Sequence, residues 1–421
     1  MTNRPGIIKH PDSAGEMRQP SGLTKVWEAD CPAGRDLLVR DRGNEGKPGK
    51  RAEKMATKMA GKKVVVAGAT GLVGNAALRH FGATGGAEVI ALSRRQPREL
   101  YGARHVVLDL TDAAQCTGAA GELAGTTHLI YAALYEEPNL VDGWRDQRQI
   151  DINDHMLRNL MGALEPVSPA LKHVALLQGT KAYGVHVRPL TVPAREGRSE
   201  MYEQPNFYWA QENFLRDQQR GKAWHFSILR PVLIIGLAMG GAMDLVPPLG
   251  VYAAVLREQG RALDFPGGAA RVAQAVDVDL LARAIAWSGE SAAAKNEIFN
   301  VTNGDVFVWP NVWPAIADAL GFAAGGHVPL ALDKEIRPRE AEWAEIRQQH
   351  GLVSGNLKEF VGLSFEYADY TMGFGRTQPG PPALVSTIKL MQAGFHEVMD
   401  TEAMFAKAVA ELQAKSLLPP R

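Results

Sequence analysis

A glycine-rich segment follows a strongly apolar run and has the spacing of a nucleotide-binding turn. Residues 63–67 read Lys-Val-Val-Val-Ala, and glycines follow at positions 68, 71 and 74. Gly68 suits the backbone angles of a tight turn, Gly71 leaves room for a pyrophosphate, and Gly74 lets a helix pack closely on the strand. Free N–H groups at a helix N-terminus attract anions. The contacts predicted for a dinucleotide are Gly68, Thr70, Gly71, Leu72, Val73 and Gly74.

The residues after the second apolar run indicate which nicotinamide dinucleotide would bind. An acidic residue at this place usually binds the ribose hydroxyls of NAD. This chain has Ser93-Arg94-Arg95 instead. A carboxylate would repel a 2′-phosphate, whereas a guanidinium group binds one with paired hydrogen bonds. The sequence therefore predicts NADPH, held in part by Ser93, Arg94 and Arg95.

Two further segments, of two residues each, belong to the same predicted site. Asp109 and Leu110 follow the third apolar run, where the adenine amino group would be held. Ala132 and Ala133 follow the fourth run and are small, as is expected where the cofactor ribose would pass.

A tyrosine and a displaced lysine are the candidates for the chemistry. The fifth run is followed by Gln178-Gly-Thr-Lys181-Ala-Tyr183, and Tyr208 comes later in Asn206-Phe-Tyr208-Trp. The extended short-chain dehydrogenases carry a Ser or Thr at the first place and Tyr-x-x-x-Lys at the second. Here the residue four positions after Tyr208 is Glu212, and the lysine stands at position 181.

This combination resembles the progesterone 5β-reductase and iridoid synthase family, which is called PRISE and consists of NADPH-dependent enone reductases of the extended short-chain class. The resemblance runs from about Lys63 to the C-terminus. It rests on the glycine turn, Ser93-Arg-Arg95, Thr127-His-Leu-Ile-Tyr131, Lys172-His-Val, Gln178, Lys181, Tyr183, Asn206-Phe-Tyr208, Arg230-Pro231, Val251-Tyr-Ala-Ala254, Gly394-Phe-His-Glu-Val398 and Asp400-Thr-Glu402. The chain departs from the family at Leu134, where a tryptophan is frequent, and at Thr180 and Ala182.

The resemblance implies that Tyr208 and Lys181 are catalytic. During reduction of an α,β-unsaturated carbonyl, negative charge develops on the carbonyl oxygen, and a donor aimed at that oxygen lowers the barrier. Tyr208 would be that donor, and the charge of Lys181 would favour the enolate and lower the phenol pKa. Further cofactor contacts are expected at Gln178, Tyr208, Pro231, Val232 and Ile234.

The expected substrate is a small hydrophobic enone or enal. We expect Tyr135, Trp144, Tyr183 and Met243 to line its pocket. Two other readings stay open. One is a carbonyl reductase or sugar-nucleotide epimerase of the same class, which should carry the lysine that Glu212 replaces. The other is a non-catalytic NADPH-binding sensor, which would not need both Tyr208 and Lys181.

The elements that must position these residues alternate between strand and helix. Apolar runs predict strands at 63–67, 88–92, 105–108, 128–131, 173–177, 226–229 and 298–301, and helices at 72–81, 150–164 and 208–219. Such alternation predicts an α/β fold with a doubly wound parallel sheet of the Rossmann type. We expect a flexible leader over residues 1–61, a cofactor-binding core mainly over 62–235, and a smaller substrate-binding lobe mainly over 236–421, with the last strand of the sheet near 298–301.

Composition excludes several classes of protein. The 421 residues include 46 Lys and Arg and 46 Asp and Glu, so the chain has no general attraction to nucleic acid or anionic lipid. The two cysteines exclude a disulfide scaffold and a zinc site of cysteine pairs, and no metal site is expected. The longest apolar stretch, residues 231–243, is too short to span a membrane. We expect a cytoplasmic enzyme that binds neither nucleic acid nor membrane, with a homodimer as one possible assembly.

Overall fold

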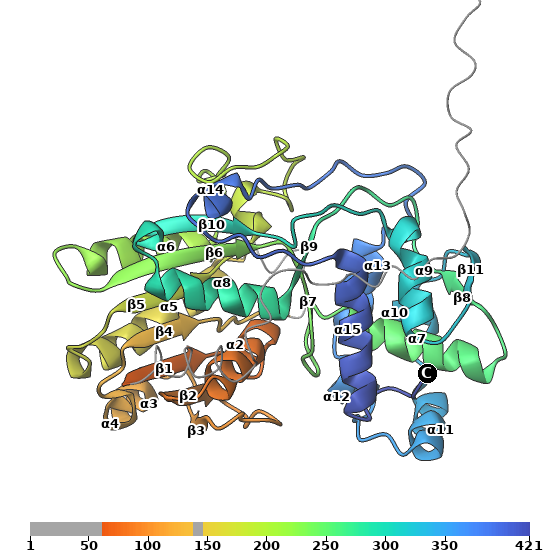
Figure 1. Ribbon diagram of the computed structural model, residues 1–421, viewed down its shortest axis with the longest axis horizontal. Helices are drawn as coiled ribbons and strands as arrows, with labels where there is room; N and C mark the ends of the chain where they lie inside the picture. Colours follow the sequence, from red (N-terminus) through yellow and green to blue (C-terminus); the bar gives the residue numbers. More distant parts are fainter. Residues whose placement is uncertain (1–60, 138–145) are drawn as a thin grey trace, which may run out of the picture. The chain divides into compact units, whose positions relative to one another are not determined.

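Seven of the apolar runs form one parallel sheet, which confirms the predicted fold class. The computed structural model describes residues 61–137 and 146–421. The strand order is β10-β6-β5-β4-β1-β2-β3, and every neighbouring pair is parallel (Figure 1). The strands are β1 Lys62–Ala67, β2 Ala87–Ser93, β3 Arg104–Val107, β4 His128–Tyr131, β5 His173–Leu177, β6 His225–Pro231 and β10 Glu297–Val301.

Side chains alternate between the two faces of the sheet, and helices bury both faces. Val65 and Ala67 of β1 pack into one cluster with residues of α5 (Gln147–Leu164) and α6 (Phe207–Gln219). Val64 and Val66 pack on the opposite face against α2 (Leu72–Ala83) and α8 (Val278–Glu290). Because both faces are covered, β1 and β4 are continuous apolar runs rather than alternating ones. The short helices α3 (Ala113–Gly118) and α4 (Ala120–Leu123) follow β3.

The strand order reverses between β1 and β4, and this point determines where a ligand is expected. In open α/β sheets, ligands bind beyond the carboxyl ends of the strands at such a switch point. Gly68 directly follows β1 and Ala132 directly follows β4. The two predicted cofactor segments therefore meet at the switch point.

The C-terminal part of the chain builds a second apolar core beside the sheet. Its helices gather on one side of the sheet in Figure 1. The buried indoles of Trp309, Trp313 and Trp343 lie in this core with Phe405. Two pairs of short strands, β7 with β9 and β8 with β11, complete the lobe. The elements are β7 Leu233–Ile235, α7 Val246–Glu258, β8 Leu263–Phe265, β9 Ala275–Asp277, α9 Trp309–Ala319, β11 Ala324–His327, α10 Leu332–Glu335, α11 Glu340–His350, α12 Leu357–Phe360, α13 Ser364–Thr371 and α15 Thr401–Ala414.

The predicted boundary at residue 235 divides the sequence more simply than the fold does. Strand β10 was expected within the C-terminal part, but α8 and α14 (Ile388–Gln392) also return to the sheet, where they pack beside β5, β6 and β10. The predicted leader, residues 1–61, lies outside the described residues except for Gly61.

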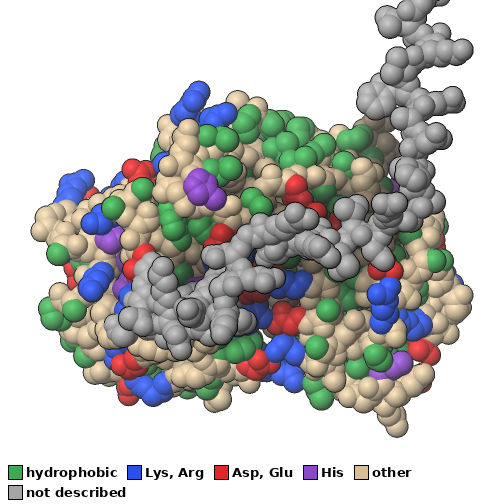
Figure 2. Space-filling model, viewed as in Figure 1, with side chains coloured by type: hydrophobic (Ala, Val, Ile, Leu, Met, Phe, Trp, Pro, Cys, Tyr) green, Lys and Arg blue, Asp and Glu red, His purple; other side chains and the backbone are tan. Residues whose placement is uncertain are grey.

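Charges of both signs are interspersed over the face seen in Figure 2. Within the described ranges, none of the helices has the length and apolar character needed to cross a membrane.

Candidate active site

The glycine turn has the geometry that each glycine was predicted to provide. Gly68 has a positive φ of 83°, and a Cβ there would lie 2.6 Å from the carbonyl oxygen of Ala132. A Cβ on Gly74 would lie 2.1 Å from the carbonyl oxygen of Gly68. A Cβ on Gly71 would meet only that oxygen, at 3.5 Å. Gly68 and Gly74 are therefore required by the fold, whereas the space in front of Gly71 is left open.

The start of α2 faces this open space. Gly71 is the N-cap residue and has no side chain to occupy the first N–H groups of the helix, and the first turn has no acidic residue. Such a helix start is suited to an anion. The turn therefore fits the pyrophosphate of a dinucleotide.

The basic residues after β2 are held in a defined turn. The Ser93 hydroxyl donates to the carbonyl oxygen of Arg95 over 2.7 Å, and Nε2 of His105 lies 3.1 Å from the same hydroxyl. Arg94 and Arg95 are exposed. Neither arginine forms an ion pair with any residue in the part of the chain that the structure describes. Both guanidinium groups are therefore available to a phosphate.

The remaining predicted cofactor residues lie at the same edge of the sheet, with different surroundings. Asp109 uses Oδ1 to accept hydrogen bonds from the backbone N–H and the hydroxyl of Thr111, and Leu110 is buried in the core. Ile234 of β7 and Leu72 of α2 pack on one small cluster, which brings β7 beside the glycine turn. Ala132, Ala133 and Val232 are half-buried, and Pro231 is buried.

One asparagine joins the backbones that carry the two predicted catalytic residues. Lys181 lies in a short 3-10 helix (Thr180–Tyr183) after β5, and Tyr208 lies in the first turn of α6. The side chain of Asn206 caps α6 by accepting from the N–H of Tyr208 over 3.0 Å, and it donates to the carbonyl oxygen of Lys181 over 3.5 Å. A Cβ on Gly179 would lie 3.4 Å from the Tyr208 hydroxyl oxygen. Lys181 and Tyr208 therefore belong to one connected unit at the carboxyl edge of the sheet.

Burial shifts the pKa values of both residues in favour of their neutral forms. Burial raises the pKa of the Tyr208 hydroxyl well above its usual range, and the carboxylate of Glu136 raises it further. Burial lowers the pKa of Lys181 to about 8, although Glu136 acts in the opposite direction. The Tyr208 pKa is thus raised and not lowered as expected, because burial and Glu136 outweigh the lowering effect of Arg230. The Tyr208 hydroxyl therefore keeps its proton at neutral pH and has a hydrogen to donate.

Glu136 is a site residue that the sequence analysis missed. Besides its effects on Tyr208 and Lys181, its charge raises the pKa of Tyr367 of α13, for which burial is the larger cause. Glu136 therefore faces residues of the sheet edge and of the lobe. The sequence signal that could have identified Glu136 is a carboxylate five residues past the end of β4, beside the switch point.

The structure explains why Glu212 stands where the class usually has a lysine. Glu212 is buried, and its Oε1 accepts hydrogen bonds from Arg216 at 2.7 and 3.0 Å. Its Oε2 lies 3.4 Å from a guanidinium nitrogen of Arg230, a side chain with no solvent exposure. A second carboxylate, Glu200, lies 2.6 Å from Arg230. Glu212 is therefore a counter-ion of Arg230, and a lysine at its position would face a buried cation.

Two predicted contact residues belong to this buried network around Arg230. Gln178 accepts from Arg230 over 2.8 Å and donates to the carbonyl oxygen of Tyr208 over 3.2 Å. The Tyr183 hydroxyl donates to Asn300 of β10 over 2.7 Å, and Arg230 lies over the Tyr183 ring. These contacts hold the Gln178 and Tyr183 side chains in the buried network, and the cofactor contact of Gln178 and the substrate contact of Tyr183 stay predictions.

The other predicted substrate residues are less constrained. The Tyr135 hydroxyl donates to Glu137 over 3.0 Å, which raises its pKa, and its N–H donates to Asn153 over 2.9 Å. Met243 is half-buried in the segment between β7 and α7. Trp144 lies outside the described residues.

Sequence comparison finds similarity to a protein family and to plant enzymes named for reduction or enol formation. Residues 124–419 match the family model described as a PRISE-like Rossmann-fold domain. The (S)-8-oxocitronellyl enol synthase of Antirrhinum majus is 28% identical over 379 residues, which are 84% of this chain and 92% of that protein. The 3-oxo-Delta(4,5)-steroid 5-beta-reductase of Arabidopsis thaliana is 30% identical over 331 residues, which are 73% and 82% of the two chains.

Structural comparison adds a likeness in fold. A UDP-glucose 4-epimerase from Brucella ovis in complex with NAD matches with a TM-score of 0.58 at 16% identity, covering 86% of this chain and 100% of that one. A putative epimerase from Burkholderia cenocepacia matches with a TM-score of 0.59 at 18% identity, covering 85% and 99%. These matches agree with the Rossmann sheet described above. On the family model and the curated relatives together, the chain belongs to the PRISE-like Rossmann-fold family.

Proposed function

We propose that this protein is an NADPH-dependent oxidoreductase that reduces the activated C=C bond of an α,β-unsaturated ketone or aldehyde. The observation that carries the proposal is the connected unit of Lys181 and the buried, protonated Tyr208, at the same edge of the sheet as the glycine turn. The similarity to a steroid 5-beta-reductase and to an enol synthase supports this chemistry.

The residues present fit the cofactor. The open start of α2 would receive the pyrophosphate, and Arg94 and Arg95 would bind the 2′-phosphate that distinguishes NADPH from NADH. When bound, NADPH supplies the hydride for the reduction.

The chain's own residues would stabilise the charge that this reduction creates. As the β-carbon of the substrate gains a hydride, negative charge moves to the carbonyl oxygen. The hydroxyl of Tyr208 donates a hydrogen bond to that oxygen, and Lys181 in its charged form supplies a nearby cation. A proton from water then reaches the α-carbon, which gives the saturated carbonyl compound. Productive geometry requires the reacting carbon to lie about 3–3.5 Å from the hydride donor.

The bond that is reduced can be identified with NADPH carrying deuterium at C4 and a simple cyclic enone. Deuterium at the β-carbon is the expected result. Deuterium at a carbinol carbon would instead identify a carbonyl reductase. No transfer to any enone or ketone would favour a protein that only binds the dinucleotide.

The role of Tyr208 is tested by Tyr208→Phe in the same assay. Loss of one preorganised donor typically costs on the order of 10²–10³ in kcat. We expect a loss of this size with unchanged NADPH affinity. Turnover at the original rate would contradict the assigned role.

Cofactor preference is tested by comparing the Kd values of NADPH and NADH. Hydrogen bonds to charged groups contribute about 1.5–3 kcal/mol, so Arg94→Glu should weaken NADPH binding by roughly tenfold or more. Equal affinity of the unaltered protein for the two dinucleotides would refute the preference.

A further inference from the structure

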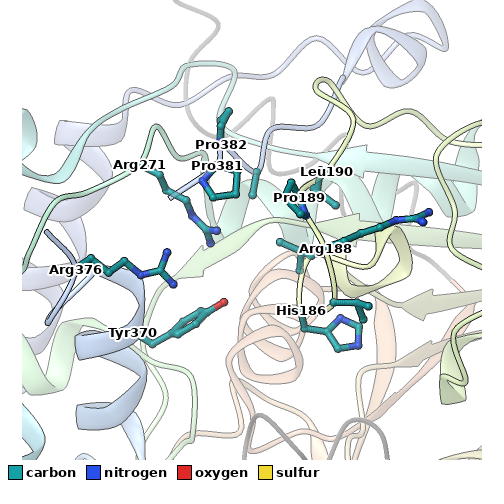
Figure 3. Close-up of a pocket in the computed structure, with 12 residues that line it drawn as sticks. His186, Arg188, Pro189, Leu190, Arg271, Tyr370, Arg376, Pro381 and Pro382 are labelled. Atoms are coloured by element: carbon teal, nitrogen blue, oxygen red, sulfur yellow. The ribbon is translucent and has the colours of Figure 1, made fainter. Parts of the chain in front are cut away.

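A small cavity lies beyond the catalytic residues and plays no part in the proposed chemistry. Its volume is about 230 Å³, and it opens between the loop at residues 185–190 and the lobe (Figure 3). Sites for whole small molecules are usually about 300–1,000 Å³. A cavity of this size is therefore suited to a substituent of a ligand whose main part lies elsewhere. The lobe contributes Arg271, Tyr370, Arg376, Pro381, Pro382 and Ala383.

Two arginines give this cavity an uncompensated positive charge. Figure 3 shows the side chains of Arg271 and Arg376 directed toward the space that the hydroxyl of Tyr370 also faces. No aspartate or glutamate is among the residues lining the cavity. Over the described ranges of the chain, neither Arg271 nor Arg376 forms an ion pair.

The third arginine at the cavity is arranged differently. The guanidinium group of Arg188 points away from the other two in Figure 3 and lies 3.2 Å from the carboxylate of Glu203. The positive charge available to a ligand therefore comes from the lobe side alone.

The cavity adjoins the catalytic residues through both of its walls. The loop at residues 185–190 begins directly after the 3-10 helix that carries Lys181 and its glycine cap. On the lobe side, Glu136 raises the pKa of the Tyr367 hydroxyl and Arg271 lowers it. The charge of Glu136 also raises the pKa values of both Lys181 and Tyr208. A ligand that reached from Tyr208 toward Tyr367 would extend toward the two arginines.

We propose that Arg271 and Arg376 form an anion-binding subsite that holds a carboxylate of the substrate, so that the preferred enones carry a carboxylate away from the reacting double bond. This inference rests on the proposed enone reduction. A guanidinium group matches a carboxylate with two parallel hydrogen bonds, and the Tyr370 hydroxyl adds a second type of donor. A carboxylate also supplies the negative charge that the cavity itself lacks.

A matched pair of substrates tests the subsite. The acid is a cyclic enone with an acetic-acid side chain, and the control is its methyl ester, which has the same reacting bond and no charge. We expect kcat/KM for the acid to exceed that for the ester by about tenfold or more, since hydrogen bonds to charged groups are stronger than neutral ones. The double variant Arg271→Gln with Arg376→Gln should remove this preference and leave the ester unchanged.

Arg188→Gln is the matched control variant, because it removes an arginine from the same region that points away from the other two. It should retain the preference for the acid. Equal kcat/KM for acid and ester in the unaltered protein would overturn the subsite and leave the proposed reduction standing. If Arg188→Gln lost the preference for the acid as fully as the double variant does, the preference would be a general charge effect, and the subsite would also be overturned.

A binding measurement separates the subsite from the proposed reaction. The saturated keto acid, which cannot be reduced at a C=C bond, is titrated into the protein by calorimetry. Binding that the double variant weakens by about tenfold supports the subsite even if no enone is turned over, an outcome that would refute the proposed function alone. Binding unaffected by the double variant, or none at all, overturns the subsite. Melting temperatures confirm that the variants are folded, and the two single substitutions serve if the double variant is not.

Discussion

Burial acts in opposite chemical directions on Lys181 and Tyr208, because it penalises whichever form of a group is charged. The charged form of a tyrosine is the deprotonated one, so burial keeps the proton on Tyr208. The charged form of a lysine is the protonated one, so burial lowers the pKa of Lys181 to about 8. Tyr208 therefore remains a donor over the accessible pH range, while the charge of Lys181 changes near neutrality. Glu136 preserves part of that charge.

The pH dependence of enone reduction should reveal Lys181. Its pKa lies near 8 in the folded protein instead of 10.5, so the cation is present below pH 8 and is lost as the pH rises through this value. We expect kcat/KM to fall above about pH 8 in the unaltered protein. Lys181→Arg, which stays charged, should keep some activity and lack this fall. An unaltered profile that stays flat up to pH 10, or the same fall in the arginine variant, would show that another group titrates.

At the scale of the elements, the glycines between β1 and α2 have different roles. Gly68 and Gly74 are required by packing, whereas Gly71 leaves space. Gly74 lies against the carbonyl oxygen of Gly68, and Gly68 lies against Ala132 at the end of β4. These approaches hold two strands and a helix together at the switch point. Gly71 has a φ of −79°, and a Cβ there would meet only the Gly68 carbonyl oxygen, at 3.5 Å, so packing does not require its lack of a side chain.

Two alanine substitutions distinguish these functions. In Gly74→Ala the Cβ would lie 2.1 Å from a backbone oxygen. The free energy of unfolding should therefore fall by about 1–3 kcal/mol, the usual cost of overpacking. Gly71→Ala should leave the free energy of unfolding nearly unchanged and raise the Kd of the dinucleotide. Urea denaturation and fluorescence titration measure the two effects. A reversed pattern would mean that Gly71 has a packing role.

Helix α6 carries its own charge pattern, with Tyr208 at the open end and Glu212 one turn later against Arg230. The usual lysine of the short-chain class would point toward this buried guanidinium. The carboxylate at position 212 and the lysine at position 181, the proposed catalytic cation, are therefore consistent with one arrangement.

Restoring the usual lysine should damage the fold. Glu212→Lys would remove a counter-ion of Arg230 and add a second buried cation beside it, and breaking a buried pair costs about 3–5 kcal/mol. Glu212→Gln, which keeps a hydrogen-bond acceptor, should cost less. Chemical denaturation of both variants provides the measurement. A stable Glu212→Lys protein with increased ketone reduction would contradict this account.

At the scale of the whole molecule, the sheet and the lobe are interleaved along the chain. Helix α8, strand β10 and helix α14 return to the sheet after the chain has begun the lobe at β7 and before the lobe closes with α15. The candidate catalytic residues come from the sheet edge, whereas Arg271 and Arg376 of the proposed subsite come from the lobe. The proposed site therefore draws on both parts of the fold.

Removing residues 1–58 should leave this assembly intact. The sequence of the segment has no periodic apolar face, and among the described residues the first strand begins at Lys62. We expect the shortened protein to keep its melting temperature and its kcat for enone reduction. A clear fall in either value would mean that the segment contributes to the folded enzyme.

The sequence alone was enough to predict the seven strands, the Rossmann class and the family, because the signals are local. A strand buried on both faces must be apolar throughout, as in Val64 to Ala67, and a tight turn beneath a helix start needs glycine at fixed spacing. Lys181 and Tyr208 were identified in the same way, from short motifs and the resemblance they carry. Their meeting at one edge follows from parallel strands.

Only the tertiary structure decided which charges these residues face. Glu136, Arg230 and Glu212 are separated along the chain by many residues, and nothing in their local sequence specifies which carboxylate meets which cation. The reversal of the expected effect on the Tyr208 pKa had the same origin. Desolvation and Coulomb interactions depend on distances across the folded molecule, and folding sets those distances by packing the lobe and both helical layers against the sheet.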